Sequence, residues 1–176
     1  MVVALQKFSV SGPAGQLEGL VHMPDDIPCA IAVVAHPLPT MGGTMENKVA
    51  VMLAKTFTEL GCVSLRFNFR GVGSSEGAFS GGDGEEQDMI AVVQYAQEQF
   101  GEELPLLLSG FSFGGYIAAR VAQHLKPQHL VLAAPAVGHF AMPVVAPETL
   151  VIHGEHDDVV PLSDAMDWAR PLHLPI

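Results

Sequence analysis

Basic residues are scarce in this sequence. Its 176 residues include 8 Lys and Arg against 19 Asp and Glu, which gives a formal net charge of −11 at pH 7. A chain with this balance repels phosphate backbones, so we exclude nucleic acid as a partner. Charged residues make up only 15% of the chain and hydrophobic residues 49%, a composition too apolar for disorder. The length is that of one domain, and we expect residues 1–176 to fold as a single unit.

Cysteine is also rare, since only Cys29 and Cys62 occur. Two cysteines do not form the disulfide framework of a small secreted protein. Because both lie in or beside apolar runs, we predict two buried thiols. The sequence has no run of 18 apolar residues, and its N-terminus lacks the basic and apolar regions of a signal peptide. These absences predict a cytoplasmic protein with no membrane partner.

What the sequence does contain is a series of short apolar runs separated by longer amphipathic stretches. The runs cover residues 30–35, 62–67, 104–108, 129–134 and 149–153. Continuous apolar runs are typical of parallel strands that are buried on both faces. Their alternation with helices predicts an α/β fold, with a mostly parallel, twisted sheet and helices on both faces. Residues 2–10 and 16–23, joined by a turn with Gly and Pro, predict an antiparallel hairpin at the sheet edge.

Two of the helices can be predicted from spacing. Apolar side chains recur at near-3.6 intervals over residues 49–60 and 89–100, and the two stretches are followed by Gly61 and Gly101. Acidic residues at positions 85, 86 and 88 precede the second stretch, where they favour a helix N-terminus through the helix dipole.

The apolar run at residues 104–108 leads directly into the sequence SGFSFGG and a stretch of helix-forming residues. G-x-S-x-G between a strand and a helix is the arrangement of a nucleophile elbow, in which a sharp turn exposes the serine. Gly110 and Gly114 allow the neighbouring backbone to pack without a Cβ clash. We therefore predict that Ser112 is a catalytic nucleophile and that the backbone N–H of Phe113 is free to bind a developing oxyanion.

Four segments together resemble a known family: HPLP followed by GG, then RFNFRGVGSSEG, GFSFGG and HGEHDDVVP. They lie in the order found in the α/β-hydrolase superfamily. Within it, the chain is similar to the small lidless serine hydrolases related to dienelactone hydrolases and short-chain serine esterases. The resemblance implies that the backbone N–H of Leu38 is the second oxyanion donor. It also implies that His36 is a structural residue and that Arg70 holds loop backbone.

The resemblance also implies an acid for a catalytic triad. The H-G-x-x-D pattern of the family falls on Asp157, which would accept a hydrogen bond from an imidazole and stabilise the imidazolium formed during acylation. Asp158 is the neighbouring alternative.

Two other motifs are rejected. The GVGSSEG segment has Glu76 where a dinucleotide-binding loop needs its third glycine. Residues 81–86 lack the alternating oxygen ligands of a calcium loop. We therefore predict no cofactor and no metal site.

The general base should follow the acid in sequence, and after Asp157 only His173 remains. One more helix and strand would place the base about 25 residues past the acid. Residues 160–170 are expected to form that helix and residues 172–176 to open that strand, so His173 would lie at the end of the sheet opposite the nucleophile. We expect the C-terminal strand and the histidine loop to be missing from this chain. The remaining histidines match no base position and are expected to be structural or solvated: His22, His124, His129, His139, His153 and His156.

The main functional hypothesis is a serine hydrolase that cleaves small carboxylic ester or thioester substrates through an acyl-enzyme on Ser112. Residues 135–148, between the last two apolar runs, are too few for a lid, so we expect an open site that tolerates different acyl groups. Acyl transfer to an acceptor other than water would use the same residues. The alternative is a catalytically inactive α/β-hydrolase fold that serves as a binding or assembly module, motivated by the missing histidine. A bare sheet edge would also favour a homo-oligomer.

Overall fold

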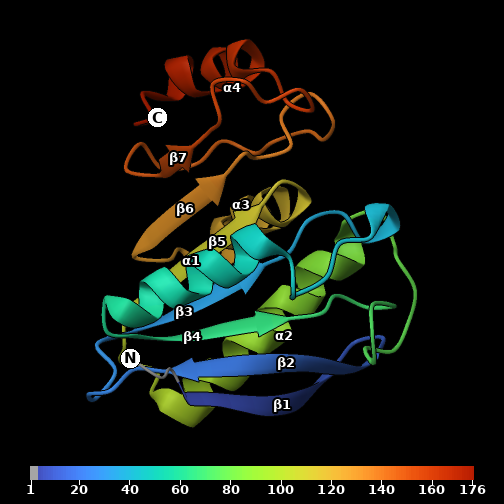
Figure 1. Cartoon of the computed structure of the whole chain (residues 1–176), viewed down its shortest axis with the longest axis vertical. Coiled ribbons are helices and arrows are strands. Elements are labelled where there is room, and N and C mark those ends of the chain that lie inside the picture. The colour runs from blue at the N-terminus through green and yellow to red at the C-terminus, as the bar shows by residue number, and fades with distance from the viewer. Residues whose placement is uncertain (1–3) are drawn as a thin grey trace.

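A seven-stranded sheet runs through the centre of the molecule in the computed structural model, which describes residues 4–176 (Figure 1). Its strand order is β1-β2-β4-β3-β5-β6-β7. The strands from β4 to β7 in this order are parallel, whereas β1 and β2 form an antiparallel hairpin at one edge. The bounds are β1 Ala4–Gly12, β2 Gly15–Met23, β3 Ala30–Ala35, β4 Cys62–Phe67, β5 Leu106–Phe111, β6 His129–Ala133 and β7 Leu150–Ile152.

Helices cover both faces of the sheet. They are α1 Lys48–Glu59, α2 Asp83–Phe100, α3 Phe113–Leu125 and α4 Leu162–Ala169, with short 3-10 turns at Pro39–Met41 and Arg170–Leu172. Successive side chains of β3 point to opposite faces. Ile31 and Val33 accordingly join the core under α2 and α3, while Ala32 and Val34 pack against α1. This arrangement confirms the predicted α/β class.

Most of the predicted strands lie where the sequence indicated them, with shifted ends. The run at residues 104–108 is the exception, because β5 begins later and continues to Phe111. Pro105 has no N–H to donate to a neighbouring strand, and its carbonyl accepts from Ile31 instead. Gly110 and Phe111 still pair with β6. The strand therefore carries the chain directly to the turn at Ser112.

The prediction of two buried thiols is wrong for Cys29, which is exposed in the loop before β3. Cys62, on β4, is buried, and burial raises the pKa of its thiol to about 11. Cys29 precedes an apolar run, but the buried strand begins one residue later, at Ala30, so Cys29 lies in the exposed loop.

The C-terminal segment differs from its prediction. The expected helix is present as α4, but residues 172–176 form no strand. A 3-10 turn ends at Leu172, and His173 adopts a left-handed conformation with φ 57°. The chain nevertheless reaches the edge of β7, where the carbonyl of Pro175 accepts a hydrogen bond of 2.9 Å from the backbone N–H of Val151.

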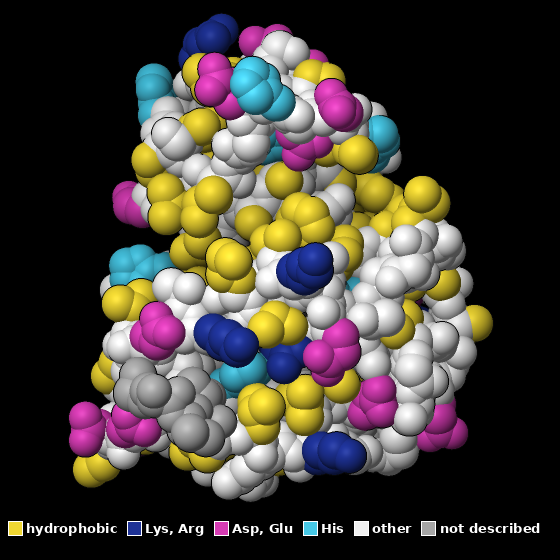
Figure 2. Space-filling view, viewed as in Figure 1, with side chains coloured by type: hydrophobic (Ala, Val, Ile, Leu, Met, Phe, Trp, Pro, Cys, Tyr) yellow, Lys and Arg dark blue, Asp and Glu magenta, His cyan; other side chains and the backbone are white. Residues whose placement is uncertain are grey.

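Apolar side chains remain exposed on β7. Leu150 and Ile152 are 41% and 51% exposed, and hydrophobic side chains gather in the part of the surface between α1 and the C-terminal segment (Figure 2). The homo-oligomer expected from a bare sheet edge stays a prediction. Within residues 4–176, no helix is long and apolar enough to cross a membrane.

Candidate active site

Ser112 occupies the turn between β5 and α3 with a backbone conformation that is unusual for a serine, φ 55° and ψ −115°. The surrounding glycines permit this turn. A Cβ on Gly110 would overlap the backbone of Gly114, and a Cβ on Gly114 would overlap the carbonyl of Ala35 on β3. Because these contacts are with backbone, side-chain movement cannot relieve them. The elbow is therefore built by the close approach of three backbone segments.

Within residues 4–176, two backbone N–H groups of residues around Ser112 have no protein acceptor. Phe113 is the first residue of α3, where an N–H has no partner inside the helix. The N–H of Leu38 donates to no protein acceptor within residues 4–176, although the Leu38 carbonyl accepts from Met41 and Gly43. Both residues line the same cavity as Ser112.

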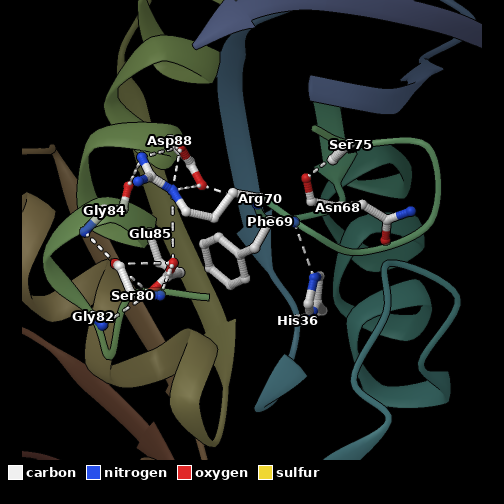
Figure 3. Close-up of polar contacts among 10 residues, drawn as sticks. All are labelled: His36, Asn68, Phe69, Arg70, Ser75, Ser80, Gly82, Gly84, Glu85 and Asp88. Atoms are coloured by element: carbon white, nitrogen blue, oxygen red, sulfur yellow. Dashed lines mark hydrogen bonds and ion pairs between the residues drawn. The ribbon is translucent and has the colours of Figure 1, made fainter. Parts of the chain in front are cut away.

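His36 fixes the start of the loop that carries Leu38. Its Nδ1 donates to the carbonyl of Pro37 at 2.7 Å, and its Nε2 accepts from the backbone N–H of Phe69 at 3.1 Å (Figure 3). Both bonds require a neutral ring with the proton on Nδ1. Burial lowers the pKa of His36 to about 4, which maintains that form. His36 is therefore a structural residue that links the ends of β3 and β4.

A cavity of about 570 Å³ opens over Ser112. One wall comes from the loop after β3 and the opposite wall from the loops after β6 and β7. Among residues 4–176, the side chains that line it are mostly apolar and include no Lys, Arg, Asp or Glu. The lining consists of Pro37, Leu38, Met41, Gly42, Gly43, Asn47, Ser112, Phe113, Ala136, His139, Phe140 and Val159.

Asp157 lies in the loop after β7, two residues before the cavity-lining Val159. Its Oδ1 accepts from the backbone N–H groups of Val159 and Val160, both at 2.8 Å. Its Oδ2 has no hydrogen-bond donor among the described residues and lies 3.9 Å from Nε2 of His153, which is itself bonded to the Val160 carbonyl. Asp158 is exposed. The local geometry thus orients the carboxylate of Asp157 and leaves one of its oxygens available.

Residues 28–147 match the family model described as serine aminopeptidase, S33. The uncharacterized protein RP471 of Rickettsia prowazekii (strain Madrid E) is 33% identical over 171 residues, which cover 92% of this chain and 71% of that protein. The chain belongs to the α/β-hydrolase superfamily.

Solved structures of other α/β hydrolases have the same fold as this chain. XC6422 of Xanthomonas campestris, an α/β serine hydrolase without a lid, is 38% identical and superposes with a TM-score of 0.91 over 98% of this chain and 81% of that one. An α/β serine hydrolase homologue from Coxiella burnetii is 37% identical, with a TM-score of 0.90 over 99% of this chain and 86% of that one. Like XC6422, this α/β hydrolase has no lid, because the described chain between β6 and β7 forms a loop without a helix.

Two histidines of the hydrolase, His173 and His139, bear on the missing general base. His173 is exposed and lies outside the Ser112 cavity. His139, which sequence reasoning assigned to a structural or solvated role, lines that cavity, and its Nε2 lies 2.9 Å from the carbonyl oxygen of Val159. The available signal was its position six residues after β6, since loops at the carboxyl ends of parallel strands meet at one edge of the sheet.

Arg70 has the structural role expected of it. Its guanidinium donates to both carboxylate oxygens of Asp88 and to the carbonyl of Gly84 (Figure 3). Asp88 also accepts from the Arg70 backbone N–H. The nearby carboxylate of Glu85 accepts from the backbone of Ser80 and Gly82. These contacts hold the loop after β4 against the start of α2. Among residues 4–176, no group of three or more His, Cys, Asp or Glu is placed to hold a metal ion.

Proposed function

We propose that this α/β hydrolase cleaves small carboxylic esters or thioesters through an acyl-enzyme on Ser112. The observation that carries the proposal is the placement of Ser112 in a strained elbow at a cavity that Leu38 and Phe113 also line, two residues whose backbone N–H groups have no protein acceptor within residues 4–176. Such a pair of preorganised donors binds the oxyanion of a tetrahedral intermediate.

The proposed reaction has two halves. In acylation, Ser112 Oγ attacks the carbonyl carbon while a general base takes the hydroxyl proton. We assign this role to a histidine oriented by Asp157. Among residues 4–176, no histidine donates to the free Oδ2 of Asp157, and His139 is the histidine that lines the cavity. The bond from the carbonyl carbon to the alcohol or thiol then breaks, and the leaving group receives that proton. In deacylation, water attacks the ester on Ser112, the carboxylic acid leaves, and the serine recovers its proton. The N–H groups of Leu38 and Phe113 bind the oxyanion in both halves.

The family model that matches this chain is described as serine aminopeptidase, so peptide substrates are the second candidate. An aminopeptidase must bind the α-ammonium group of its substrate, and a carboxylate in the site is the usual partner of a buried ammonium. The described cavity is lined by no Asp or Glu, and apolar side chains such as Leu38 and Phe140 form much of its surface. The lining therefore favours uncharged esters and thioesters.

A fluorophosphonate probe tests the nucleophile, because it reacts with activated serines. We expect labelling that is lost in Ser112→Ala and kept in Ser163→Ala, a control that removes an exposed hydroxyl from α4. His173→Asn should label like the parent chain because His173 lies away from the cavity. No labelling of the parent chain would contradict the proposal and favour the inactive binding or assembly module.

Ester turnover tests the substrate class and the acid. Nitrophenyl esters of short and medium acyl chains should be cleaved at comparable rates because the cavity is open and lidless. If a histidine oriented by Asp157 is the base, Asp157→Asn should lower kcat by roughly 10³-fold to 10⁴-fold, as loss of a triad acid does, while Asp158→Asn should leave kcat within about twofold. Faster cleavage of an aminoacyl nitroanilide than of the esters would favour the peptidase instead.

A further inference from the structure

Asn47 has two positions of interest, at the start of a helix and in the wall of the cavity. It is the N-cap of α1, and it also lines the cavity over Ser112. Among the residues that line this cavity, Asn47 offers a polar side chain on the wall formed by the loop after β3, where Pro37, Leu38 and Met41 are apolar.

The cap determines which atoms of the Asn47 amide are free. Its Oδ1 accepts from the backbone N–H of Val49 at 2.9 Å and of Ala50 at 3.3 Å. Since both partners are donors, the atom facing them must be the oxygen, and the NH₂ group must point away from the first turn of α1. The NH₂ group donates to no acceptor within residues 4–176, and the side chain is only half-buried. Two N–H donors on this cavity-lining side chain are therefore left without a protein acceptor within residues 4–176.

The segment before Asn47 is firmly held. The N–H of Asn47 donates to the carbonyl of Thr44 at 3.0 Å. The N–H of Met45 donates to Oδ1 of Asn68 at 2.8 Å, and the Met45 carbonyl accepts from the guanidinium of Arg66, a residue only 3% exposed. A donor held by its own backbone and by a cap loses little conformational entropy when it binds a ligand.

We propose that Asn47 is a substrate-binding residue, whose NH₂ group donates to an uncharged oxygen that the substrate carries besides its scissile carbonyl. This inference rests on the proposed function, because it takes the cavity over Ser112 as the substrate site. The absence of Lys and Arg from the lining, together with a net charge of −11, disfavours a carboxylate in this place. The selected class is therefore neutral esters with a hydroxyl, ether or keto oxygen.

The test compares pairs of esters that differ by one CH₂→O replacement. Suitable pairs are methyl pentanoate with methyl 3-methoxypropanoate, methyl hexanoate with methyl 4-methoxybutanoate, and butyl acetate with 2-methoxyethyl acetate. Dissociation constants are measured by NMR titration in the Ser112→Ala background, in which the esters stay intact. Asn47→Ser and Asn47→Asp are added to this background. Both substituents accept N-cap hydrogen bonds, but neither offers an NH₂ group. Comparing each pair between proteins cancels its intrinsic difference in hydration.

For at least one pair, we expect the preference for the ether ester to fall about threefold to tenfold in both Asn47 variants, as one neutral hydrogen bond predicts. The thermal midpoint should stay near that of Ser112→Ala. Met52→Leu, which changes an exposed side chain of α1 that does not line the cavity, should leave every preference unchanged. Equal preferences in all the proteins would overturn the proposal and reduce Asn47 to a helix cap. Because these measurements need no turnover, an inactive parent chain would contradict the proposed function alone.

Discussion

The two parts of the candidate site are held together by different kinds of contact. The serine half, residues 36–43 and 110–115, is fixed by backbone packed on backbone, with Gly110 against Gly114 and Gly114 against Ala35. The acid half, residues 153–160, lies in a more exposed loop after a strand of only three residues, and it is held by the side chains of His153 and Asp157 bonded to its own backbone.

Because of this difference, a substitution should cost more stability in the serine half than in the acid half. The serine half has no room to adjust, because its neighbours are main-chain atoms in the centre of the sheet. The acid half can move without unpacking the core, since its contacts are local hydrogen bonds near the surface. Substitutions of one kind, placed in each half, should therefore have unequal effects.

Matched glycine substitutions should show the largest inequality. Gly114→Ala would force a methyl group into the Ala35 carbonyl, and we expect a loss of at least about 3 kcal/mol in the free energy of unfolding. Gly154→Ala in the acid half meets nothing closer than 3.9 Å and should change that free energy by less than about 0.5 kcal/mol. Urea denaturation of the two variants measures both values. Equal losses would show that the two halves are equally rigid.

The same difference explains how much the sequence could predict. The elbow at Ser112 was predictable because the backbone approach requires glycines at fixed positions, and these are visible in the sequence. The tautomer of His36 was not, since it depends on Phe69, 33 residues away. The sequence motif favoured Asp157 over Asp158 through resemblance alone. The presence of His139 at the cavity was missed because loop conformation after β6, and not periodicity, decides where that side chain lies.

The second-largest effect should be a loss in the free energy of unfolding in mild acid, which arises in the serine half. Burial lowers the pKa of His36 from 6.5 to about 4, so the unfolded chain binds this proton first as the pH falls. The free energy of unfolding should therefore decrease between about pH 6.5 and pH 4, by up to about 3 kcal/mol from His36. Buried His22, with its pKa lowered to about 4 by burial and by Arg66, adds a loss in the same direction.

Denaturation series at several pH values can isolate the His36 contribution. His36→Asn should be less stable at pH 7 but should lose less stability than the parent chain on going to pH 4.5. His156→Asn, which changes an exposed residue of the acid half, should keep the slope of the parent chain. An unchanged slope in His36→Asn would show that this ring is not kept neutral by the fold.

In the acid half, removal of one carboxylate should have a smaller effect. Asp157→Ala removes the acceptor of two backbone N–H groups, and we expect it to lower the free energy of unfolding by about 1–2 kcal/mol. Asp157→Asn keeps an oxygen acceptor and should lose less. Asp158→Ala is the matched control because Asp158 is exposed, and it should stay within about 0.5 kcal/mol of the parent chain in urea denaturation. A loss in Asp158→Ala as large as that in Asp157→Ala would contradict the assignment of the loop contacts to Asp157.

The smallest effects on stability should come from side chains in the cavity walls, which are exposed in both halves. Met41 belongs to the serine half and Val159 to the acid half, and they are 83% and 69% exposed. Because neither side chain is buried in the fold, replacing either by Ala should change the free energy of unfolding by less than about 0.5 kcal/mol. On the proposed function, an acyl chain that fills the cavity covers both side chains. Each replacement should therefore raise KM for medium-chain nitrophenyl esters by about twofold to fivefold, with little change for nitrophenyl acetate. A rise in KM for acetate of the same size would mean that the variant had disturbed the elbow instead of the wall.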